Sequence, residues 1–114
     1  MGWTRARRLA CKGTWYDDSF DYDGPVCYEL GTAGPRGGNI RWHYVGHTKN
    51  EKSRMSCYGR DGSHLADIIN DHLDRGWCLY YRAWAFDTKE EAAAMEKRRL
   101  KSKLYDWNVI LNLR

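Results

Sequence analysis

The stretch HYVGHTKNEKSRMSCY, residues 43–58, decides the fold because its character changes at a glycine. It opens as a strand, breaks at Gly46 and continues as a short, strongly polar segment. Within that segment Arg54 and Tyr58 are four residues apart, so a helix over 50–59 places them on one face. Core packing alone does not account for a strand that is followed by a tight turn and by an exposed arginine and tyrosine, so we expect these two residues to have a functional role.

Two strands surround this point of the sequence. PVCYEL (25–30) has the apolar character of a buried strand, and NIRWHYVG (39–46) is a second strand. Between them GTAGPRGG contains four glycines and a proline, the composition of a hairpin loop.

Helical periodicity and a further strand follow. An apolar helical pattern lies between an N-cap at Ser63 and Gly76, and WCLYYRAWAF (77–86) is rich in strand-forming aromatic residues. Thr88 opens a last helix, to about Leu104, with a capping box. The order strand, strand, helix, helix, strand, helix predicts an α+β fold with a small antiparallel three-stranded sheet flanked by helices. We place this domain at 25–114, behind an N-terminal basic extension at 1–24.

The composition describes one small globular domain with a positive net charge. The chain has 114 residues, 42% of them hydrophobic, and a formal net charge of +4. Basic residues gather at 1–14 and 97–103, which fits either a polyanionic partner or a solvated surface. No apolar run reaches membrane length and no signal-peptide region is present. We therefore expect a cytoplasmic protein that does not contact a membrane.

Cysteine and histidine spacings argue against a structural metal site. The four cysteines are Cys11, Cys27, Cys57 and Cys78. They form no CxxC pair, and we expect reduced thiols. His43 and His47 are four residues apart, but Gly46 breaks any helix that would align them, which disfavours zinc.

Glu96 is conspicuous in the last helix. The expected inward stripe of this helix consists of Ala92, Ala93, Leu100 and Leu104. Glu96 falls inside the stripe, and a carboxylate that faces a core is costly unless it is paired or binds a cation. The position predicts either a salt bridge to a nearby arginine or a metal-binding or acid–base role.

Taken together, these features resemble the GIY-YIG nuclease superfamily over about residues 24–112. The first family triplet corresponds to Val26-Cys27-Tyr28, where only the tyrosine is retained, and the second to Tyr44-Val45-Gly46. His47 stands where many members carry lysine. Four further positions follow in the family's order and spacing: Arg54, Tyr58, Glu96 and Asn108.

The resemblance implies a metal-dependent endonuclease that hydrolyses DNA phosphodiester bonds and nicks one strand per active site. The implied catalytic residues are Tyr28, Tyr44, Arg54, Tyr58 and Glu96, with His47 and Asn108 in supporting or substrate-binding roles. Glu96 would hold a single Mg²⁺ or Mn²⁺, Arg54 would bind phosphate oxygens, and the tyrosines would hold or deprotonate the attacking water. Cleavage of both strands would need a homodimer or two successive visits.

Two other functions stay open at this point. One is a catalytically weak or inactive nucleic-acid-binding module with the same fold, because fold alone does not guarantee activity. The other is a protein-interaction domain that uses exposed aromatic residues. The sequence contains no zinc finger or helix-turn-helix that would define a DNA target.

Overall fold

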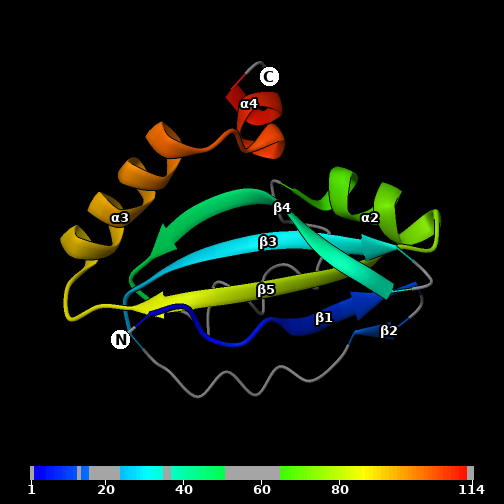
Figure 1. Cartoon of the computed structure of the whole chain (residues 1–114), viewed down its shortest axis with the longest axis horizontal. Helices are drawn as coiled ribbons and strands as arrows, with labels where there is room; N and C mark the ends of the chain where they lie inside the picture. The colour runs from blue at the N-terminus through cyan, green and yellow to red at the C-terminus, as the bar shows by residue number, and fades with distance from the viewer. Residues whose placement is uncertain (1, 13, 16–23, 35–36, 51–64, 113–114) are drawn as a thin grey trace.

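The computed structural model describes residues 2–12, 14–15, 24–34, 37–50 and 65–112, and its centre is one antiparallel sheet (Figure 1). The strands are β1 (Arg7–Cys11), β2 (Thr14–Trp15), β3 (Val26–Gly34), β4 (Gly37–Thr48) and β5 (Cys78–Ala85). The helices in the described part are α2 (Ala66–Asp74), α3 (Lys89–Ser102) and α4 (Asp106–Asn112). The strand order is β2-β1-β5-β3-β4, so β3 is internal and β4 is an edge strand.

The predicted α+β fold is confirmed, and the sheet is larger than expected. It has five strands rather than three, because β1 and the two-residue β2 come from the segment predicted as an extension. Leu9 and Ala10 of β1 are 2% and 0% exposed. The boundary between residues 24 and 25 stays a prediction. The helix expected over 50–59 and the N-cap at Ser63 lie outside the described residues.

The glycine-rich stretch predicted as a hairpin loop is largely strand. β3 continues to Gly34 and β4 begins at Gly37, with irregular pairing after Leu30 and after Thr32. Gly31 explains part of this, since a Cβ there would lie 2.5 Å from the Arg41 carbonyl oxygen. Only a residue without a side chain allows the two strands to approach so closely.

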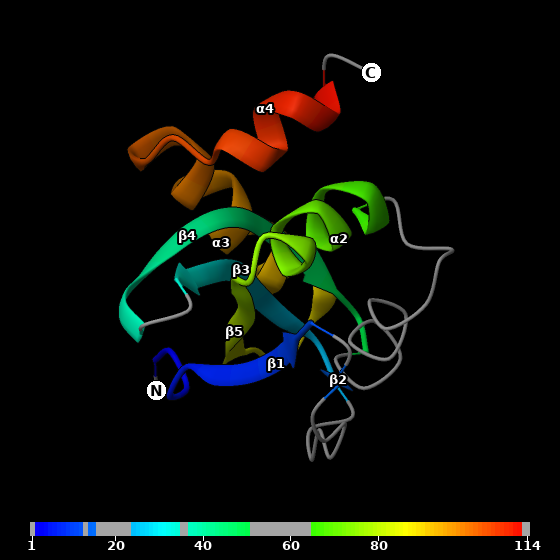
Figure 2. The same cartoon turned by 90° about the vertical axis from the view of Figure 1, so that its right-hand side faces the viewer.

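Both faces of the sheet are covered, which gives two apolar clusters. Tyr28 and Leu30 of β3 pack with Ile69 of α2 in the first cluster. Cys27 of β3 packs with Met95 of α3 in the second. Because side chains alternate along a strand, α2 and α3 lie on opposite faces. Figure 1 shows α3 on the left and α2 on the right, and in Figure 2 α2 is nearer the viewer than α3.

The helix ends follow the sequence signals, but one buried stripe was wrong. Thr88 and Glu91 form the predicted capping box at the start of α3. The buried residues of α3 are Ala92 and Met95, whereas Leu100 and Leu104 are 42% and 77% exposed. Leu100 lies in the last turn of the helix, which ends at Ser102, and Leu104 follows that end.

The chain then crosses the edge of the sheet. Tyr105 is buried in the second cluster, and Trp107 is buried in the first. Helix α4 therefore lies over β4 at the sheet edge, where Figure 1 shows it above that strand. This crossing brings residues 105–108 to both faces of the same strand.

A disulfide joins Cys11 of β1 to Cys78 of β5, across 67 residues of sequence. The expectation of reduced thiols was wrong for this pair, because the sheet brings together two cysteines that are far apart in the chain. Cys27 is a free, buried thiol. No helix in the described residues is long and apolar enough to cross a membrane. The cytoplasmic location stays a prediction.

We expect the disulfide to make a large contribution to stability. For a loop of this length, the chain-entropy model gives a loss of about 4 kcal/mol in the free energy of unfolding when the bond is removed. Urea denaturation of the protein with and without a thiol reductant measures this loss. The C11S/C78S double variant should have the stability of the reduced protein, and the reductant should not change it. A urea midpoint of this variant equal to that of the oxidised wild-type protein would contradict the expectation.

Candidate active site at the edge strand

Tyr28 and Tyr44 lie together on the α2 face of the sheet. Tyr28 pairs with Gly46 across β3 and β4, and the two tyrosine rings are 6.1 Å apart. A Cβ on residue 46 would lie 2.7 Å from the Tyr28 hydroxyl oxygen and 3.0 Å from the Tyr44 ring. The glycine of the YVG triplet thus leaves room for the Tyr28 phenol to lie across the edge strand. Tyr28 is 1% exposed and Tyr44 is partly exposed.

Glu96 and His47 meet on the α3 face of the same strand. His47 pairs with Cys27 of β3, so its side chain points away from the tyrosines. Its Nδ1 lies 3.2 Å from the Glu96 Oε1. A carboxylate only accepts hydrogen bonds, so Nδ1 carries the hydrogen in this contact. The salt bridge expected from Glu96 to an arginine is replaced by this contact with His47.

Asn108 holds the backbone of the edge strand. Its Nδ2 donates to the Val45 carbonyl oxygen, and its Oδ1 accepts from the Val45 N–H, both at 2.9 Å. The side-chain amide thereby acts as the next strand would, and it satisfies the two polar groups that an edge strand leaves unpaired. Asn108 thus fixes the strand between Tyr44 and Gly46.

A second contact on α4 was missed by the sequence reasoning. The His43 Nδ1 donates to Asp106 at 2.8 Å, its Nε2 accepts from the Thr32 hydroxyl at 2.9 Å, and its ring stacks on Trp107. Burial lowers the pKa of His43, opposed by the hydrogen bond and charge of Asp106. The signal in the sequence was the run Asp106-Trp107-Asn108, in which two polar residues stand on either side of a tryptophan.

Glu29 was also missed, although the sequence marked it. It is the only charged residue in PVCYEL and is 0% exposed in a strand buried on both faces. Arg82 and Arg99 form ion pairs with it, at 2.5 and 3.5 Å, and the Tyr105 hydroxyl donates to it. A charge inside an apolar strand predicts such partners.

The free thiol near the site is not a nucleophile. Burial raises the pKa of Cys27 to about 12, with further contributions from the charges of Glu96 and Glu29. The thiol is therefore protonated at neutral pH, and it serves as a small apolar residue.

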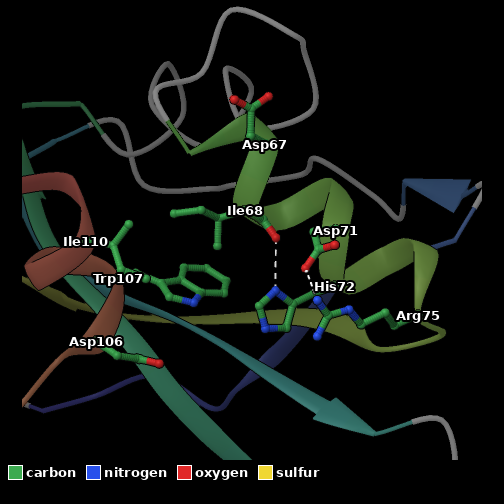
Figure 3. A pocket seen from close by; sticks show the side chains of 8 residues that line it. All are labelled: Asp67, Ile68, Asp71, His72, Arg75, Asp106, Trp107 and Ile110. Carbon is green, nitrogen blue, oxygen red and sulfur yellow. Dashed lines mark hydrogen bonds and ion pairs between the residues drawn. The ribbon is translucent and has the colours of Figure 1, made fainter. Parts of the chain in front are cut away.

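An open groove lies between α2 and α4, away from Glu96 (Figure 3). Its volume is about 450 Å³, and its lining residues are Asp67, Ile68, Asp71, His72, Arg75, Asp106, Trp107 and Ile110. Arg75 is paired with Asp71 at 2.8 Å, so the remaining charges are negative. A groove of this sign repels phosphate and does not belong to a polyanion site.

The structure thus brings the predicted residues to two faces of one strand. Tyr28 and Tyr44 are on one face of the β3–β4 pair, and Glu96 and His47 are on the other. Arg54 and Tyr58 lie outside the described residues, so their roles stay predictions.

The residues around Glu96 suit a divalent cation held by few protein ligands. Among the described residues no group of three or more His, Cys, Asp or Glu side chains could hold a metal ion. The Glu96 side chain is 25% exposed, however. Mg²⁺ commonly binds one or two carboxylates and keeps waters and phosphate oxygens in its other positions, and Glu96 fits that pattern.

The described part of the chain thus combines a YVG triplet on an edge strand, a glutamate on α3 and an asparagine of α4 that holds the strand. A family model described as "GIY-YIG domain-containing protein" matches residues 21–114. The chain belongs to this family, which places it in a nuclease superfamily whose members generally use divalent metal ions.

A plant protein is also similar to part of the chain. "Protein EFFECTOR OF TRANSCRIPTION 3" of Arabidopsis thaliana is 39% identical over 75 residues, which cover 65% of this chain and 28% of the relative. The match thus spans less than a third of that protein. No solved structure matches the chain significantly.

Replacing Gly46 by alanine tests the packing of Tyr28. The new methyl group must displace the phenol, so we expect the free energy of unfolding to fall by about 1–3 kcal/mol. Urea denaturation measures the change. Gly2→Ala is the control, because a Cβ at that position meets nothing within 4 Å. Equal stability of the two variants would show that the phenol is not held over Gly46.

Asn108→Asp tests the clamp on the edge strand. A carboxylate accepts from the Val45 N–H but cannot donate to the Val45 carbonyl, so we expect a loss of about 2 kcal/mol in unfolding free energy. Asn39→Asp, at an exposed position of the same strand, makes the same chemical change and should be nearly neutral. If both variants denature at the same urea concentration, Asn108 does not fix β4.

Proposed function

We propose that this protein is a metal-dependent DNA endonuclease that nicks one strand per active site. The observation that carries the proposal is the contact between Glu96 of α3 and His47 of β4. These two positions are 49 residues apart in sequence, yet their side chains meet at 3.2 Å, next to the YVG triplet of β4. The family membership supports the same activity.

The charge around Glu96 supports a phosphate-bearing substrate. Lys97 and Lys101 on α3 and Lys49 just after β4 are exposed. Helix α3 has 14 residues and is therefore about 21 Å long, which is about six base pairs of duplex DNA. Cations along such a length attract a nucleic-acid backbone toward the carboxylate that would hold the metal.

Each residue then has a defined task. Glu96 would hold a single Mg²⁺ or Mn²⁺, which polarises a phosphate oxygen when bound and stabilises the charge of the leaving oxygen. Arg54 would hold two non-bridging oxygens with its planar guanidinium. Tyr58 would orient or deprotonate the attacking water. Tyr28 and Tyr44, on the face opposite Glu96, would support the strand that carries His47. His47 would orient the Glu96 carboxylate.

A nucleic-acid-binding module without cleavage activity is the second candidate. The name of the Arabidopsis relative, an effector of transcription, favours it, as does the loss of two residues from the first family triplet. Incubation with supercoiled plasmid separates the candidates. Nicking that requires a divalent metal and stops with a chelator supports the enzyme. Salt-sensitive retardation of DNA without nicking supports the binding module.

Glu96→Gln tests the metal ligand. The variant keeps the size of the side chain but removes its charge, so cleavage should fall by about 100-fold or more while the fold persists. DNA binding should be equal or tighter, because one negative charge near the phosphate is gone. Glu90→Gln, at an exposed position of the same helix, is the matched control and should cleave normally. Cleavage by Glu96→Gln at the wild-type rate would exclude the metal role.

A further inference from the structure

Helix α3 carries Glu96, yet little apolar surface fixes its rotation. Its buried residues are Ala92 and Met95, both in the N-terminal half of the helix. The leucine that falls in its last turns, Leu100, is 42% exposed. A small methyl group and a flexible thioether give a weakly specified contact, because methionine adapts to many packing geometries. Another interaction must set how the C-terminal half meets the sheet.

Arg99 provides that interaction. It continues the inward stripe four residues after Met95, where an apolar residue would be expected. Its Nε donates to the Tyr105 hydroxyl at 3.1 Å, and its Nη2 lies 3.5 Å from the Glu29 Oε2. The Tyr105 hydroxyl in turn donates to the same carboxylate. The three side chains form a closed set of contacts that links β3, α3 and the start of the crossing to α4.

The acceptor in this set is itself held in place. Glu29 is 0% exposed, and Arg82 of the neighbouring strand pairs with its Oε1. The Arg82 guanidinium lies over the rings of Trp3 and Trp42, at 4.7 and 4.6 Å from their centroids. An arginine in contact with two aromatic rings has less freedom to turn. The Glu29 carboxylate is therefore a fixed anchor for Arg99.

The protonation states keep this anchor intact at neutral pH. Burial raises the pKa of Tyr105 to about 12, and the hydrogen bond to Glu29 adds to the effect, so the phenol stays a donor. Burial alone would lower the pKa of Arg99, but the hydrogen bond with Tyr105 and the charge of Glu29 outweigh it and raise the pKa.

Glu96 lies three residues before Arg99, so the two side chains share one face of the helix. Rotation of α3 about its axis would carry both away from the sheet together. We infer that Arg99 is a positioning residue, whose contacts with Glu29 and Tyr105 set the rotation of α3 and hold Glu96 against His47. The consequence for metal binding rests on the proposed function, whereas the effect on the Glu96–His47 contact does not.

Arg99→Met tests the inference, because it keeps the length of the side chain and removes its donors. Two quantities are measured on the full chain: the nuclear Overhauser effect between the His47 ring and the Glu96 side chain, and the Mn²⁺ concentration that gives half-maximal plasmid nicking. We expect loss of the first and an increase of about tenfold in the second, as for other residues that orient a metal ligand. Maximal nicking at saturating Mn²⁺ should change less. Arg99→Lys should restore part of the contact.

Lys89→Met is the matched control, because it removes one exposed cation from the same helix without touching Glu29. It should keep both the Overhauser effect and the Mn²⁺ requirement. If Arg99→Met does not fold, Tyr105→Phe removes only the hydroxyl and should raise the Mn²⁺ requirement by about threefold and weaken the Overhauser effect. A folded Arg99→Met or Tyr105→Phe protein with both values unchanged overturns the inference. If the wild-type protein does not nick, the proposed function fails, and the Overhauser effect alone decides the role of Arg99.

Discussion

The buried carboxylate of Glu29 is the constraint on which much of this structure depends. It lies on an internal strand, fully removed from water, and a charge in such a place must be compensated. Its partners come from β5, from α3 and from the residue that starts the crossing to α4. Replacing such a group with apolar side chains often stabilises a protein, so its value here lies in geometry. Arg82, Arg99 and Tyr105 come from three different parts of the chain, and all three must lie next to the Glu29 carboxylate for their donors to be paired.

Contacts from several elements also hold the edge strand β4 in place. β4 is covered on both faces, and α4 passes over its open side, so the strand that carries the YVG triplet is enclosed on three sides. Asn108 completes its hydrogen bonding, and His43 with Asp106 ties the start of α4 to the strand. Functional side chains gain precision when they stand on elements held in this way. The two tyrosines and the Glu96–His47 pair lie on opposite faces of the strand, close to Gly46 in its sequence.

Local sequence signals predicted most of the helices and strands, but they could not predict which segments of the chain contact one another. The capping box at Thr88 and the apolar spacing of α2 are properties of adjacent residues, and both were confirmed. Glu96 lies on the predicted last helix, whereas no helix was predicted around Asn108, which lies on α4. The error at Leu100 and Leu104 arose because helical periodicity shows which residues share a face but not where the helix leaves the sheet. The pairing of Cys11 with Cys78 depends on strand order, which a hydrophobic pattern does not encode.

The position of β1 has a consequence for how the chain is made. Its only described neighbours in the sheet are β2 and β5, and β5 ends at Ala85, so β1 is synthesised before β5 but can be placed only after it. Until β5 has left the ribosome, Leu9 and Ala10 have no apolar surface from that strand to pack against. The covalent bond between these strands can form only after that pairing. In a nascent molecule β1 is thus exposed to wrong partners until β5 arrives, and its cross-link to β5 records that the two strands have paired.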